Sequence, residues 1–113
     1  MPDRVKKIYD KLLVDFYLKA EDTPLLLGEI VRKDQNGICA LHNEIISKVP
    51  EEIKNSHIIS SVGYSHRGDR YHFSKQEYKL SGVRYAQTYL KTLGIDIQVF
   101  DPNFYIFFII WTI

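Results

Sequence analysis

The sequence predicts a small α+β protein, a single domain over residues 1–113. Three observations support this prediction. The N-terminal segment has the apolar spacing of an amphipathic helix, a capping pattern precedes a second long helical segment at about 75–93, and several short apolar runs are bounded by turn residues. With 45% hydrophobic and 26% charged residues, a chain of 113 residues can bury a core without disulfides or metals.

The N-terminal segment is expected to form a helix near 4–19. Its apolar residues recur every three or four positions and so share one helical face: Val5, Ile8, Tyr9, Leu12, Leu13, Phe16 and Tyr17. Asp3 can cap the start of this helix by accepting hydrogen bonds from free backbone amides. Pro24 disfavours helical angles at the residue before it, so the helix should end by the sequence EDTP.

Residues 24–50 are compatible with two structures. Thr23 followed by Pro24 is a typical helix start, and apolar residues up to Val49 also fit a helical spacing. The dipeptide Asn36-Gly37 instead favours a hairpin turn, because both residues tolerate positive φ. The sequence favours short helices slightly, and three of them followed by a hairpin would resemble a winged-helix layout.

Residues 57–64 and 70–73 are predicted to be two strands joined by a turn at 66–69. Ser74 and Glu77 then form an S-x-x-E capping box, which predicts a helix over about 75–93. Its core face should carry Val83, Ala86, Leu90 and Leu93. Gly94 can adopt the left-handed conformation that ends a helix.

The C-terminal segment is predicted to complete an antiparallel or mixed sheet. Two apolar runs, 95–100 and 104–112, flank the turn signal Asp-Pro-Asn. The second run is too short to span a bilayer as a helix. We expect it to be a strand that is covered on both faces or buried in a homodimer, because an exposed apolar edge of this length would aggregate.

No metal site, cofactor or secretory segment is predicted. A single cysteine, Cys39, excludes an internal disulfide, and the N-terminus lacks a signal-peptide pattern, so we expect a cytoplasmic protein without a membrane association. Cys39 and His42, with His66 and His72, supply residue types that zinc uses. Their spacing is poor, because the last two would point from different strands of the predicted hairpin.

The segment YSHRGDRYHF contains groups suited to catalysis. His66 or His72 could act as a general base beside Asp69, with Arg67 binding an anionic phosphodiester substrate. However, the motifs of common enzymes are absent from the sequence, and neighbours in sequence need not converge in space. We therefore assign no catalytic residue, and the sequence favours a protein that is not an enzyme.

Charge and tyrosine content favour a binding surface instead. Residues 64–93 hold six basic and two acidic residues, a balance of +4, while the rest of the chain sums to −3. Tyrosine and arginine are enriched in binding hot spots, and the same residues suit contacts to nucleic acid. The predicted surface, formed by the 64–73 hairpin and the 75–93 helix, comprises Tyr64, His66, Arg67, Arg70, Tyr71, Lys75, Tyr78, Lys79, Arg84, Tyr85 and Tyr89.

Three functions are compatible with these observations. The favoured one is a non-enzymatic adaptor or inhibitor that binds an acidic protein partner through this surface. The alternative is a nucleic-acid-binding protein that uses the same surface or a winged-helix N-terminal half. A second alternative is a small phosphodiester-cleaving enzyme that uses His66 or His72. The overall charge of only +1 favours the protein partner over nucleic acid.

Overall fold

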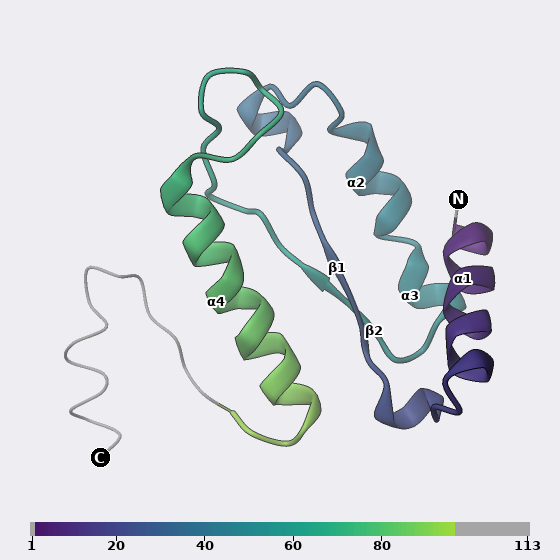
Figure 1. Cartoon of the computed structure of the whole chain (residues 1–113). Helices are drawn as coiled ribbons and strands as arrows, with labels where there is room; N and C mark the ends of the chain where they lie inside the picture. Colours follow the sequence, from purple (N-terminus) through teal and green to yellow (C-terminus); the bar gives the residue numbers. More distant parts are fainter. Residues whose placement is uncertain (1, 97–113) are drawn as a thin grey trace, which may run out of the picture.

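Helices pack on both sides of a small sheet in the computed structural model, which describes residues 2–96 (Figure 1). The elements in order are α1 (Pro2–Asp15), β1 (Leu25–Gly28), α2 (Leu41–Ile46), α3 (Val49–Glu52), β2 (Ser56–Ile59) and α4 (Lys75–Thr92). Short 3₁₀ turns cover Ala20–Asp22 and Lys33–Gln35. The two strands lie between α4 on one side and α1, α2 and α3 on the other (Figure 1). This arrangement is consistent with the expected α+β class.

The sheet of residues 2–96 consists of β1 and β2, and these strands are parallel. Leu25 pairs with Ser56, and Gly28 pairs with Ile59. The prediction of an antiparallel or mixed sheet was therefore wrong. Parallel strands need a long crossover, and the segment with α2 and α3 provides it. With β1 and this crossover in place, the N-terminal half does not have the three helices and hairpin of the alternative winged-helix layout.

The expected helix at the start of residues 24–50 is replaced by strand β1. A run of leucines is compatible with either structure, and its surroundings decide: Leu25 and Leu27 pack against the core while pairing with β2. Nor does Asn36-Gly37 form a hairpin turn. Asn36 has a φ of 57° and ends the 3₁₀ turn that precedes it. The later part of the region is helical as expected, in α2 and α3.

Helix α1 ends at Asp15 rather than near residue 19. Tyr17 adopts a left-handed conformation, with a φ of 55°. The amide of Leu18 donates to the carbonyl of Leu13 (2.9 Å), and the amide of Tyr17 donates to that of Val14 (3.3 Å). This is a Schellman motif, which closes a helix before the next residue can extend it. Glycine usually occupies this position and marks the end of a helix in the sequence, whereas a tyrosine gives no such signal.

Helix α4 begins and ends close to the predicted residues. Ser74 occupies the N-cap, although its side chain makes no cap hydrogen bond. The expected capping box is absent, because Glu77 accepts a hydrogen bond from the Ser65 hydroxyl instead (3.1 Å). Gly94, with a φ of 79°, closes the helix as predicted: the Ile95 amide donates to the Leu90 carbonyl (3.0 Å).

The predicted core face of α4 was wrong. Val83, Ala86 and Leu93 are exposed, and none of the helix residues is fully buried. Tyr85 packs against the sheet instead, so close to Gly28 that a β-carbon there would overlap its hydroxyl. Because the apolar residues of this helix are not confined to one face, their spacing could not determine which side contacts the sheet.

The core of residues 2–96 lies between α1, α3 and the sheet. Tyr9, Val49 and Ile53 are buried together, and partly buried residues of α1 and β1 surround them. The Tyr9 hydroxyl donates to the Thr23 carbonyl (2.7 Å), so its polar end is satisfied while its ring fills the core. Burial raises the pKa of Tyr9 above its usual value, and the phenol therefore stays protonated at neutral pH.

The other predicted strands are shorter or lie elsewhere. Of the expected strand 57–64, only residues 57–59 belong to the sheet, as part of β2 (Ser56–Ile59). The chain then turns, and the backbone amide of Tyr64 donates to the Ser61 carbonyl (3.0 Å). Residues 70–73 form no strand, and a single antiparallel bridge joins His66 to Phe73. The expected strand 104–112 lies outside the described residues, as does most of 95–100. None of the helices in residues 2–96 has the length and apolar character needed to cross a bilayer.

Alanine at position 37 is expected to lower the free energy of unfolding by about 1–3 kcal/mol. Its β-carbon would overlap the backbone carbonyl of Val31, which cannot rotate away like a side chain. The matched control is Gly82→Ala, where a β-carbon meets nothing within 4 Å and alanine stabilises a helix by up to about 1 kcal/mol. Thermal denaturation compares the two variants. Equal melting temperatures for Gly37→Ala and the wild type would contradict the expected overlap.

Candidate functional site

The loop that connects β2 to α4 contains a short closed segment, residues 65–74, which we call the dyad loop. The amide of Arg67 donates to the carbonyl of His72 (3.0 Å), and the amide of Ser74 donates to that of Ser65 (3.2 Å). These bonds bring the two ends of the loop together at the N-terminus of α4. These two hydrogen bonds therefore fix the positions of the residues at which the tip of the loop begins and ends.

Asp69 organises this tip. Its Oδ1 accepts hydrogen bonds from the amides of Tyr71 (2.9 Å) and His72 (2.8 Å), the Asx-type arrangement in which an aspartate bonds the backbone that follows it. Its Oδ2 lies 2.6 Å from Nδ1 of the His72 ring. An aspartate and a histidine three positions apart are thus held side by side by the aspartate's own backbone contacts.

Hydrogen bonds hold the pKa of the Asp69 carboxyl well below its usual range. The largest contribution comes from the backbone amide of His72, followed by the His72 ring, the Tyr71 amide and, more weakly, the Arg67 side chain. Each of these bonds favours the charged form of the carboxyl group. Asp69 therefore stays ionised at every pH at which a histidine changes its charge.

The ionised carboxylate fixes the tautomer of His72. It can only accept a hydrogen bond, so Nδ1 of the neutral ring carries the proton and Nε2 keeps a free lone pair. Arg67 Nε donates to Asp69 Oδ2 (2.9 Å). Arg67 Nη2 also lies 3.2 Å from His72 Nδ1; both groups would be donors there, so the shorter contact of Nδ1 with the carboxylate (2.6 Å) decides the tautomer. About 44% of the His72 side chain and 35% of that of Asp69 are exposed. Small molecules can therefore reach the pair.

His66 has a different role in the loop. Its Nδ1 accepts hydrogen bonds from the amides of Gly68 (3.0 Å) and Arg70 (3.1 Å). Its lone pair is thus used by the backbone, so the two histidines that the sequence treated as equivalent candidate bases differ. Of the two, only His72 is paired with a carboxylate.

Contacts with an earlier segment of the chain hold the loop in place. The side chain of Arg70 donates to the carbonyl of Asn36 (2.8 Å), and the amide of Ile38 donates to the carbonyl of Arg70 (3.0 Å). Figure 1 shows the loop before α4 next to the segment between β1 and α2. Arg70 therefore stabilises the site and is not a free surface cation.

A cavity of about 470 Å³ adjoins the pair. His72, Tyr71 and Phe73 line it from the dyad loop, and residues from three other segments complete it: Ile30, Cys39, His42 and Tyr78. The lining contains neither lysine nor arginine. An apolar and aromatic cavity of this kind is suited to a neutral organic group.

Three residues of the predicted binding surface are engaged in contacts within the protein. Tyr64 is only 2% exposed and meets the Phe73 ring edge-on. Arg84 lies over the Tyr64 ring, and its Nη1 donates to the carbonyls of Ser60 (2.7 Å) and Val62 (3.0 Å). Tyr85 packs against Gly28. Tyr64 is thus buried, Arg84 holds α4 to the segment after β2, and Tyr85 contacts the sheet, so these three side chains are not presented to a partner as the sequence predicted.

The remaining members of that surface are more accessible. Tyr71, Tyr78 and Tyr89 are each about half exposed, and Lys75 and Lys79 are exposed. Phe73 contacts Tyr78 edge-on, with ring centroids 5.7 Å apart. The structure thus separates the predicted surface into the loop residues around His72 and an exposed basic stretch at the start of α4.

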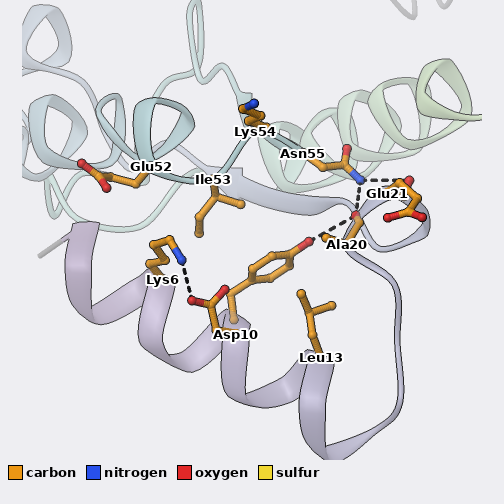
Figure 2. A pocket seen from close by; sticks show the side chains of 10 residues that line it. Lys6, Asp10, Leu13, Ala20, Glu21, Glu52, Ile53, Lys54 and Asn55 are labelled. Carbon is orange, nitrogen blue, oxygen red and sulfur yellow. Dashed lines mark hydrogen bonds and ion pairs between the residues drawn. The ribbon is translucent and has the colours of Figure 1, made fainter.

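A larger cavity, of about 640 Å³, lies between α1 and the segment around β2. Figure 2 shows Lys6 and Asp10 of α1 on one side of it, facing Lys54 and Asn55. The Asn55 amide donates to the carbonyl of Ala20 (2.9 Å). The charged residues that line this cavity include both acidic and basic side chains, and none of them is paired with a histidine as Asp69 is in the dyad loop. This cavity therefore indicates no particular reaction.

The sequence contained a usable signal for the Asp69–His72 pair. An aspartate in a glycine-containing turn accepts amides two and three residues later, and this places the side chain of the third residue beside its carboxylate. The two residues were named as candidates, but their proximity in sequence did not by itself predict that the side chains converge. As for metals, no cluster of three or more histidine, cysteine, aspartate or glutamate side chains suited to an ion occurs within residues 2–96.

Comparison with known proteins adds no further assignment. The chain matches no model of a known protein family. No solved structure matches it either.

Proposed function

We propose that the chain carries the acid–base centre of an ester hydrolase, in which Asp69 orients His72 and His72 acts as the general base. The observation that carries this proposal is the 2.6 Å contact between Asp69 Oδ2 and His72 Nδ1. A carboxylate on Nδ1 leaves Nε2 free to accept a proton, and it stabilises the imidazolium that results. The hydrogen bonds that keep Asp69 ionised support the same role.

In this mechanism His72 Nε2 removes the proton from an attacking hydroxyl group or water as the oxygen attacks the ester carbonyl. The imidazolium is stabilised by Asp69 and then gives its proton to the leaving alcohol. Within residues 2–96, the polar contacts of the His72 ring are both at Nδ1: a hydrogen bond to Asp69 Oδ2, and Arg67 Nη2 at 3.2 Å. Nε2 is therefore available to the nucleophile.

The cavity favours a neutral acyl ester over a phosphodiester. Phosphoryl transfer needs positive charges around the transferred group, but the lining of the cavity beside His72 is mainly apolar and aromatic. Arg67 lies near the Nδ1 side of the ring, where Asp69 already accepts its hydrogen bond. An acyl group could instead contact Tyr71, Phe73 and Tyr78.

The experiment that tests this proposal is hydrolysis of p-nitrophenyl acetate by the full chain, with bis(p-nitrophenyl) phosphate as the comparison substrate. An imidazole with a free lone pair can attack such an activated ester directly, or can activate a water molecule to attack it, without the help of other groups. We expect turnover of the acetate that depends on His72, and little turnover of the phosphate. Equal rates for the wild type and a His72 variant would contradict the proposal.

A second candidate function is binding of an acidic protein through the start of α4. Lys75 and Lys79 are exposed there next to Tyr78, which is about half exposed. Exposed lysines steer an acidic partner and mainly raise the association rate. Nucleic acid would meet the same charges and is the alternative ligand. For both functions we propose the cytoplasm, since the single cysteine, Cys39, is an exposed thiol of the kind that a reducing compartment preserves.

Charge reversal at Lys75 and Lys79 is expected to slow association with polyglutamate by about 10-fold or more at low salt, and by less at high salt. The control reverses Lys7 and Lys48, which are also exposed but lie on other elements. Surface plasmon resonance with polyglutamate and with a single-stranded oligonucleotide separates the two ligand classes. Unchanged association for the Lys75/Lys79 variant would exclude this stretch as the binding surface.

A further inference from the structure

The backbone on both sides of Asp69 adopts an uncommon conformation. Gly68 has a φ of 106° and Arg70 has a φ of 61°. Glycine tolerates such angles, whereas a residue with a β-carbon adopts them only when its surroundings hold it there. The carboxylate of Asp69 points to His72 only while these two neighbours keep their conformation.

His66 contacts both of these neighbours. Its Nδ1 accepts hydrogen bonds from the amides of Gly68 and Arg70, at 3.0 and 3.1 Å. Since both amides are donors, Nδ1 must be unprotonated, and Nε2 of the neutral ring carries the proton. His66 and His72 thus adopt opposite tautomers within one loop.

We propose that His66 is a positioning residue that holds Asp69 in line with His72 by binding the two amides that flank the aspartate. It acts through the backbone, since its lone pair is occupied by Gly68 and Arg70. The proposal deepens the hydrolase function and rests on it for its catalytic consequence. Its structural part, the orientation of Asp69 and the tautomer of His72, can be measured without a substrate.

The chemistry of the contact suggests closely matched variants. In His66→Asn, the side-chain Oδ1 stands two bonds from the β-carbon, as Nδ1 does in histidine, and it can accept both amides. His66→Gln moves the acceptor one bond further out, and His66→Ala removes it. A role that depends on the acceptor predicts that asparagine alone restores the wild-type loop.

The experiment combines NMR of the full chain with kinetics. In His66→Ala, we expect amide exchange at Gly68 and Arg70 to accelerate by at least about 10-fold. The ¹⁵N shifts of the His72 ring should show that the proton is no longer confined to Nδ1. Hydrolysis of p-nitrophenyl acetate should fall about 10- to 100-fold, because the pair is no longer aligned. His66→Asn should resemble the wild type in all three measurements, and His66→Gln should resemble His66→Ala.

Two results would overturn the proposal: wild-type exchange and tautomer in His66→Ala, or no recovery in His66→Asn relative to His66→Ala in variants whose circular dichroism shows an intact fold. Failure of the hydrolase function is distinguishable from these. In that case hydrolysis would not depend on His72, while exchange at Gly68 and Arg70 would still respond to position 66.

Discussion

Alanine at position 72 is expected to reduce hydrolysis of p-nitrophenyl acetate by about 10²- to 10⁴-fold, the usual contribution of a general base. Among residues 2–96, His72 is the histidine whose Nδ1 bonds a carboxylate while its Nε2 stays free. Since about 44% of the His72 side chain is exposed and it is not part of the buried core, the melting temperature should change little. The measurement is kcat/KM together with thermal denaturation.

Asp69→Asn separates the orientation of the ring from its presence. The asparagine Oδ1 can still accept the amides of Tyr71 and His72, so the loop keeps its shape. Its NH₂ group, however, is a donor facing His72 Nδ1, and this moves the proton to Nε2 and removes the base. Activity should therefore fall nearly as far as in His72→Ala.

The matched control is His42→Ala. His42 lines the same cavity but has no carboxylate partner among the hydrogen bonds of residues 2–96. We expect a loss of less than about 10-fold, since only a contact with the acyl group would be affected. If His42→Ala lowered activity as much as His72→Ala, the base would not be identified by its pairing with Asp69.

The second large effect is expected on stability. Ile53→Ala should lower the free energy of unfolding by about 2–5 kcal/mol, because it opens a cavity in the core. Ile53 is only 4% exposed and packs with Tyr9 and Val49. Against a typical total of about 5–15 kcal/mol, this loss should lower the melting temperature by about 10 °C or more.

Ile8→Ala provides the control for this variant. Ile8 belongs to the apolar spacing of α1, but 64% of it is exposed. Its truncation should change the stability by no more than about 0.5 kcal/mol. Equal effects of the two substitutions in urea denaturation would show that the core does not lie between α1, α3 and the sheet.

Local signals in the sequence predicted several features correctly. Helix α4 lies between Ser74 and Gly94 as predicted, and Gly94 closes it in the left-handed conformation, whereas Ser74 occupies the N-cap without the side-chain hydrogen bond on which the prediction was based. Strand β1 was missed because its partner, β2, lies far along the chain, and a leucine run has no preference that decides between helix and strand. The side of α4 that contacts the sheet was missed because Tyr85 fits over Gly28, a match of shape between distant residues.

For the candidate site, too, the sequence predicted which residues take part but not how they are arranged. Asp69, His72, Arg67 and His66 were all identified as chemically suitable from their residue types and proximity. Their separate roles depend on atoms: which oxygen of Asp69 faces the ring, and which nitrogen of each histidine is occupied. These details follow from backbone angles at Gly68 and Arg70, which a sequence of residue types does not specify.

The short span of the dyad loop affects the order in which the protein folds. His66 meets Phe73 seven positions later, whereas Leu25 of β1 must find Ser56 of β2, thirty-one positions later. Closing the longer span costs about 1.3 kcal/mol more chain entropy, and contacts between distant residues form slowly. The loop can therefore close before the sheet has paired. Its attachment to residues 36–38 also joins segments that are far apart in the sequence. We therefore expect the rate of refolding to be set by assembly of the strands and not by closure of the dyad loop.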